Sequence, residues 1–114
     1  MQLAAQITFH GMKHSAALAQ AIGKRTDKLA RLHPQLTSCR AVLEHAARSK
    51  QQGKEFVVRL DLKAPGADIA INRDHSEDPF VAVRSAFDAA RRKLNALARR
   101  KSGAAKRRAA DGLA

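Results

Sequence analysis

The clearest pattern along the chain is an apolar stripe in its C-terminal third. Hydrophobic side chains recur there at steps of three and four, the spacing that brings them to one side of an α-helix. The stripe consists of Phe80, Val83, Phe87, Ala90, Leu94 and Leu97. Asp78 can cap the start of such a helix, and Pro79 suits its first turn. We therefore predict a helix that begins at Pro79 and packs one face against a core.

A strand and another helix are predicted in the first third of the chain. Apolar and more polar residues alternate from Leu3 to Phe9, the period of a strand with one buried face. Ser15 can then cap a helix that ends at His33-Pro34, because proline disfavours helical backbone in the residue before it. The apolar stripe of this helix comprises Leu18, Ile22, Leu29 and Leu32.

Three further strands are predicted between the two helices, at about residues 38–46, 55–62 and 67–73. A polar loop over residues 48–54 joins the first two of these strands. Pro65-Gly66 fits the central pair of a type II turn and joins the last two as a tight hairpin. The element order is therefore β-α-β-β-β-α. Two helices with one apolar stripe each are most simply buried on one face of a four-stranded sheet, an α+β two-layer sandwich.

Positive charge is concentrated on the second predicted helix. The 114-residue chain carries a formal net charge of +12, and its isoelectric point is about 11.1. Ten of its 22 lysines and arginines fall between Arg84 and Arg108, where Asp88 is the only acid, so this segment supplies +9. Helical geometry directs Arg92, Lys93, Arg99 and Arg100 away from the apolar stripe and sets Arg84 and Arg91 along its border. A docked helix with a cationic outer surface favours a polyanionic partner.

The first helix adds to this cationic surface if the helices lie side by side. Lys24, Lys28 and Arg31 fall outside its apolar stripe, whereas Arg25 falls within it. An arginine at that position must extend out between the two helices. A structural role and an RNA contact are both open for Arg25. The candidate RNA-binding residues are Lys24, Arg25, Lys28, Arg31, Arg84, Arg91, Arg92, Lys93, Arg99, Arg100 and Lys101.

Several classes of protein are disfavoured. Cys39 is the only cysteine, so neither an intramolecular disulfide nor a thiolate metal site is expected, and the absence of a signal-like or membrane-spanning segment favours a cytoplasmic location. The acids and histidine among residues 68–78 match no metal-ligand spacing, and His10 and His14 flank a glycine without an adjacent catalytic glutamate. The sequence therefore predicts no metal, no cofactor, no small-molecule substrate and no enzyme. With no Trp or Tyr, and four Phe at apolar-patterned positions, aromatic stacking is not expected to carry recognition.

The chain resembles the bacterial ribosome-hibernation factors, the family of hibernation-promoting factor and the ribosome-associated inhibitor, over roughly residues 2–101. The resemblance rests on Arg25-x-x-Lys28-Leu29, on Glu77-Asp78-x-Phe80-x-Ala82-Val83 and on Arg92-x-Leu94. It implies a double-stranded-RNA-binding-like fold and a stress-related translation inhibitor. Such a protein binds the small ribosomal subunit and its RNA near the decoding region, and so blocks messenger and transfer RNA.

The resemblance also has departures and implications for the rest of the chain. The family often has a lysine where this chain has Ala89, and a small or polar residue where it has Arg84. Residues 1–101 are expected to form the ribosome-binding domain, and residues 102–114 a basic, disordered tail, as in the short members of the family. We expect a monomer off the ribosome. Two alternatives stay open, namely a general RNA-binding module and a regulator that docks on an acidic protein.

Overall fold

The computed structural model describes residues 3–47 and 54–112. The elements follow the predicted order, so the α+β fold predicted from the sequence is confirmed. They are β1 (Ala5–His10), α1 (Ala16–Leu32), β2 (Ser38–Ala47), β3 (Lys54–Ala64), β4 (Ala67–Ser76) and α2 (Pro79–Gly112). The polar loop predicted between β2 and β3 falls mainly on residues 48–53, which lie outside the described residues.

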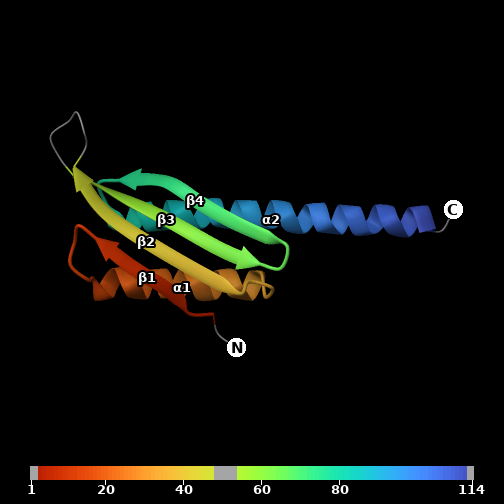
Figure 1. Ribbon diagram of the computed structural model, residues 1–114, viewed down its shortest axis with the longest axis horizontal. Helices are drawn as coiled ribbons and strands as arrows, with labels where there is room; N and C mark the ends of the chain where they lie inside the picture. The colour runs from red at the N-terminus through yellow and green to blue at the C-terminus, as the bar shows by residue number, and fades with distance from the viewer. Residues whose placement is uncertain (1–2, 48–53, 113–114) are drawn as a thin grey trace.

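The four strands form one mixed sheet in the order β1-β2-β3-β4. β1 pairs with β2 in parallel, from Ala5 opposite Cys39 to His10 opposite Glu44. This pairing is parallel because α1 returns the chain to the end of the sheet at which β1 begins. The other two pairs are antiparallel. Both helices cover the same face and run in the same direction, which gives the predicted two-layer sandwich (Figure 1). Within the described residues, no helix covers the opposite face of the sheet.

The helix starts follow from the predicted capping residues. The Ser15 hydroxyl accepts a hydrogen bond from the Leu18 amide at 3.2 Å, and a carboxylate oxygen of Asp78 accepts one from the Phe80 amide at 2.9 Å. Each bond satisfies an amide that has no partner within its own helix. Capping therefore fixes where α1 and α2 begin relative to the sheet.

Two glycines hold backbone conformations that other residues rarely adopt. Gly66 has φ +77° in the β3–β4 turn, as a type II turn requires of its third residue. Gly11 has φ +68° just after β1, and a Cβ atom there would lie 2.6 Å from the carbonyl oxygen of His45. A side chain at Gly11 would therefore push β1 away from the end of β2.

The core lies between the helices and the covered face of the sheet. Ile22 of α1, Val83 of α2, and Leu43 and Leu60 of the central strands are all at most 1% exposed. The alternating residues of β3 and the buried face of α2 supply half of the remaining core. The other buried hydrophobic residues are Leu18, Leu29, Leu36, Cys39, Ala41, Val58, Leu62, Ile69, Ile71, Ala82, Ala86, Phe87, Ala90 and Leu94.

Two members of the predicted apolar stripes are exposed, and Leu97 is only partly buried. Leu32 is 57% exposed and Phe80 is 48% exposed. Each stands in a terminal turn of its helix, roughly 70–80° around the axis from the centre of the residues that the helix buries. Periodicity correctly predicts the face of such a residue, but only a neighbouring element can cover it at a helix end.

The second helix is longer than its apolar pattern. The sequence predicts disorder from about residue 102, whereas α2 continues to Gly112 and comprises 34 residues. Its last turns project beyond the sheet in Figure 1, and the longest dimension of the molecule is 64 Å. The segment is rich in Ala, Lys and Arg, which have high helix propensity and can extend a helix that is already nucleated. The division into a domain of residues 1–101 and a tail of residues 102–114 stays a prediction.

Candidate nucleic-acid interface

The two helices form one continuous layer. α1 contacts β1 and α2, while α2 also contacts β3 and β4, so their outer sides lie next to each other (Figure 1). A hydrogen bond of 3.1 Å joins Nε2 of the buried His33, at the C-terminal cap of α1, to Oδ1 of Asn95 in α2. This pair holds the end of α1 against the middle of α2.

A shallow groove runs between the helices at this level. Leu29, Leu32 and Phe87 supply its apolar part. Three cationic side chains also line it, those of Arg25, Lys28 and Arg91. The remaining lining residue is Asp88, the only acid between Arg84 and Arg108. Arg25 is half-buried there, so its predicted position between the helices is confirmed.

The other candidate residues extend the cationic surface beyond the groove. Arg84 lies two helical turns before Arg91, on the same side of α2. Arg92 and Arg99 fall on the side of α2 farthest from the sheet. The exposed candidates are Lys24, Lys28, Arg31, Arg84, Arg91, Arg92, Lys93, Arg99 and Arg100. The side chain of Lys101 lies outside the described part of the chain.

Lys93 stands apart from this group. Its ammonium group donates a hydrogen bond of 3.2 Å to the backbone carbonyl of Ala70 in the edge strand β4. Helical geometry separates Lys93 from Arg91 by roughly 160° around the axis, so the two cannot face the same groove. The helix layer therefore carries most of the predicted residues on one surface, with Lys93 at its margin and Arg100, seven residues later, on the same side of α2 as Lys93.

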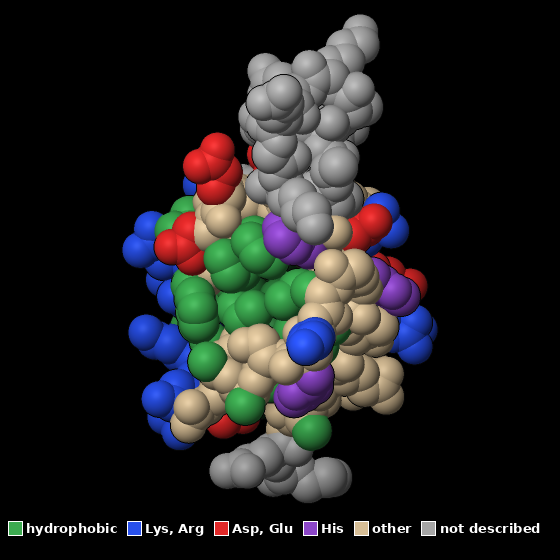
Figure 2. Space-filling view, turned by 90° about the vertical axis from the view of Figure 1, so that its left-hand side faces the viewer, with side chains coloured by type: hydrophobic (Ala, Val, Ile, Leu, Met, Phe, Trp, Pro, Cys, Tyr) green, Lys and Arg blue, Asp and Glu red, His purple; other side chains and the backbone are tan. Residues whose placement is uncertain are grey.

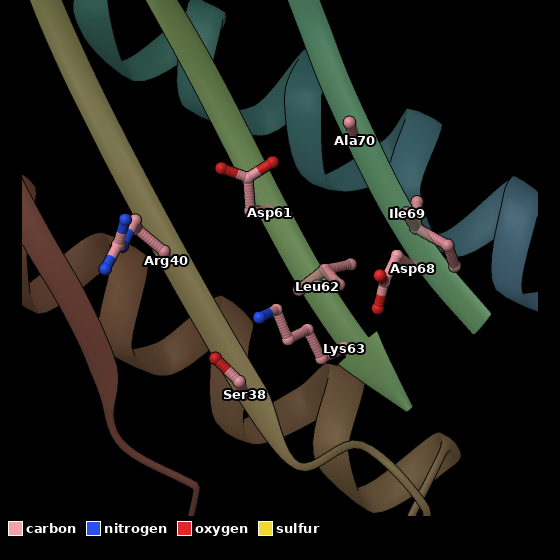
Figure 3. Close-up of a pocket in the computed structure, with 8 residues that line it drawn as sticks. All are labelled: Ser38, Arg40, Asp61, Leu62, Lys63, Asp68, Ile69 and Ala70. Carbon is pink, nitrogen blue, oxygen red and sulfur yellow. The ribbon is translucent and has the colours of Figure 1, made fainter. Parts of the chain in front are cut away.

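The uncovered face of the sheet has a different charge pattern. Arg40 pairs with Asp61 across β2 and β3, and Lys63 pairs with Asp68 across β3 and β4. Figure 3 shows these four side chains around a hollow in the sheet surface. Charges of both signs alternate there, so a polyanion gains little from this face. In Figure 2, which views the end where both helices begin, Lys and Arg side chains gather on the flank formed by the helices.

The sequence model of the sigma 54 modulation protein / S30EA ribosomal protein family matches residues 5–102. The chain belongs to this family. The match covers most of the chain and confirms the family predicted from the motifs in the two helices. It also confirms association with the ribosome at the level of the family.

Solved structures confirm the S30EA fold. A ribosomal subunit interface protein from Coxiella burnetii is 20% identical, with a TM-score of 0.66, over 82% of this chain and 94% of that one. The N-terminal domain of Protein Y from Thermus thermophilus is 17% identical, with a TM-score of 0.69, over 85% of this chain and 99% of that one. No curated protein matches the sequence at the same level of significance.

The S30EA chain also presents an aromatic side chain that sequence reasoning missed. Phe80 was expected to be buried, which left no aromatic ring available for stacking, but half of its surface is exposed at the start of α2. Figure 2 shows an apolar area at this end of the molecule. The contribution of Asn95 to the helix pair was also missed, because a lone polar residue in a charged helix gives no sequence signal.

Other chemistry has little support in the S30EA chain. Within the described residues, no group of three or more His, Cys, Asp or Glu side chains could hold a metal ion. Cys39 is buried beside the Thr26 hydroxyl at 3.6 Å, and burial raises the pKa of its thiol above the usual value of 9.0. A protonated, inaccessible thiol is a poor nucleophile. Of the helices in the described part of the chain, none is long and apolar enough to cross a membrane.

Proposed function

We propose that this protein binds the small ribosomal subunit through the outer surface of its helix pair and keeps ribosomes inactive under stress. Occupancy of the decoding region would exclude messenger and transfer RNA. The observation that carries the proposal is the placement of Arg25, Lys28 and Arg91 in one groove, on the opposite side from the mixed charges of the sheet. The protein acts in this proposal as a cytoplasmic monomer, without a cofactor and without catalysis.

The physical basis of binding is the neutralisation of RNA phosphates. Each lysine or arginine that contacts a phosphate releases condensed counterions, so affinity falls steeply with salt. For about eight contacts, the slope of log affinity against log salt is about −6 to −7. Two adjacent helices can follow the backbone and shape of folded RNA without reading its sequence. The ribosome then provides selectivity through the shape of its RNA.

Co-sedimentation with purified ribosomal subunits tests the proposal. We expect the protein to migrate with the small subunit at low salt, to dissociate as salt rises, and to inhibit translation in a purified system. An excess of bulk RNA should displace little of it. If bulk RNA instead displaces the protein readily from small subunits, the protein is a general RNA-binding module and the ribosomal proposal is wrong.

A further inference from the structure

The acidic residue in the groove is not explained by phosphate binding alone. Asp88 is the only acid between Arg84 and Arg108, yet it lines the groove together with Arg25, Lys28 and Arg91. A carboxylate at this position repels phosphate and lowers the positive potential of the groove. A surface that bound only the RNA backbone would be stronger without it.

The apolar part of the groove is equally unexplained. Leu32 is 57% exposed and lies at the end of α1 beside the buried Leu29 and Phe87. A large aliphatic side chain beside three cations offers no favourable contact to a phosphate. It does offer a surface to a flat ring with apolar faces.

An unpaired nucleotide matches all three chemistries of the groove. Its base has apolar faces, its Watson–Crick edge carries N–H donors, and its flanking phosphates are anionic. Resting on the proposed RNA-binding function, we infer that the groove between α1 and α2 binds one unpaired guanine of the RNA. The guanine face contacts Leu32, its N1 and N2 donors reach the Asp88 carboxylate, and Arg25, Lys28 and Arg91 contact the adjacent phosphates.

Guanine fits this carboxylate better than the other bases. It presents two adjacent N–H donors, which match the two oxygens of a carboxylate, whereas uracil presents one donor between two acceptors. A two-bond contact of this kind discriminates against a wrong base by about tenfold or more. The carboxylate therefore gives base preference where the cations give affinity.

The size of the groove decides between a free nucleotide and a nucleotide within RNA. The groove encloses about 70 Å³, well below the roughly 300 Å³ at which small-molecule sites begin. It can hold the edge and one face of a base but cannot surround a free nucleotide. Most of the affinity must then come from cations elsewhere on the helix pair, so the base is recognised as part of a longer RNA.

Short RNAs with one variable base test the inference. The probes are a labelled oligouridine, the same strand with one central guanosine, and the same strand with inosine, which lacks the N2 donor. In fluorescence anisotropy, we expect the wild-type protein to prefer guanosine over uridine by about tenfold, with inosine between them. Asp88→Asn should remove this preference, while Asp61→Asn, with the same charge change on the exposed sheet face, should keep it.

Leu32→Gln provides a second variant, and it should fold because Leu32 is largely exposed. It should weaken binding of the guanosine strand several-fold and leave the uridine strand almost unchanged. If Asp88→Asn and Asp61→Asn both tighten binding of all three strands equally, Asp88 does not contact a base and the inference is wrong. Small-subunit co-sedimentation of the same proteins separates this failure from that of the proposed function, since the latter predicts ribosome binding whether or not guanine is preferred.

Discussion

At the scale of single residues, a few polar side chains fix the helix pair that carries the cationic surface. His33 is 5% exposed, and its ring bonds to Asn95 across the two helices. A buried polar group that loses its partner destabilises the folded state more than the net value of one hydrogen bond. This contact therefore helps to fix the spacing of the helices at the groove, together with the buried side chains of Leu29 and Phe87.

Asn95→Ala should lower the free energy of unfolding by about 1–2 kcal/mol, because the buried His33 ring loses the oxygen with which it is paired. Urea denaturation at neutral pH measures this change. Asn72→Ala, at an exposed position of β4, is the matched control and should change stability by less than about 0.5 kcal/mol. Equal losses in both variants would contradict a structural role for the His33–Asn95 bond.

Cys39 should make stability depend on pH above neutrality. Burial raises the pKa of its thiol in the folded state, so the folded protein holds the proton at pH values where the unfolded chain releases it. The resulting stabilisation is fully present below the pKa of the unfolded thiol, near 9, and is lost as pH rises through the folded pKa. Urea denaturation between pH 8 and pH 10 should show a steeper fall for the wild type than for Cys39→Ala.

The same burial should protect Cys39 from alkylation. A maleimide or iodoacetamide reagent should modify the native protein far more slowly than the protein in urea, because both access and thiolate formation require opening of the core. Rapid modification under native conditions would show that the region between α1 and β2 opens frequently. It would also remove the basis for the expected pH dependence.

At the scale of elements, the sequence predicted the type and orientation of an element only where another element packs against it. The alternation of β3 and the stripe of α2 from Val83 to Leu94 predicted both type and orientation, because burial against a neighbour imposes the period. Leu32 and Phe80 were assigned to the buried faces by the same period, but they stand at helix ends where the described elements leave about half of each side chain exposed. The continuation of α2 to Gly112 was missed because the sequence after Leu97 has no apolar stripe that would indicate a packed helix.

The candidate site was predictable only in part. The angle of Arg25 relative to its own stripe predicted its place between the helices. The position of Lys93 over β4 was not predictable, because it depends on which side of α2 faces the edge of the sheet. The groove around Asp88 required the relative placement of two helices, which no local pattern encodes.

Removal of residues 102–114 should leave the sheet and both helix stripes folded, because the deleted segment follows the last stripe residue, Leu97. It removes Lys106, Arg107 and Arg108 together with Asp111. Affinity for the small subunit should fall, and the salt slope should become shallower by at most about 2 to 3, if these three residues contact phosphates. Subunit co-sedimentation at several salt concentrations measures both. Complete loss of binding would instead indicate that this segment is the main docking element, as for a regulator of an acidic protein.

At the scale of the whole molecule, the two layers divide the charge. The helix layer presents cations on α1 and α2, and the exposed sheet face alternates opposite charges across neighbouring strands. Arg40 and Lys63 are exposed like most basic residues of the helices, yet each lies opposite an acid on a neighbouring strand. Position rather than number of basic residues should therefore determine RNA affinity.

The double variant Lys28→Ala/Arg91→Ala should weaken small-subunit binding at least tenfold and make the salt slope shallower by about 1.5, because it removes two cations of the groove. Arg40→Ala/Lys63→Ala carries the same change in net charge on the exposed sheet face and should bind almost as the wild type does. Binding isotherms at matched salt compare the two. Similar losses in both would indicate that net charge alone drives association.

The end of α2 that projects beyond the sheet should be the part of the protein most open to hydrogen exchange and proteolysis in solution. An isolated helix of this length is only marginally stable in water, so the amide hydrogens of its last turns should exchange with deuterium long before those of the sheet. Lys106, Arg107 and Arg108 also give trypsin three adjacent cleavage points there. A brief digestion should therefore remove the end of α2 and leave a domain that still unfolds cooperatively. One preparation can then contain two species of different net charge, the full-length chain and the shortened chain.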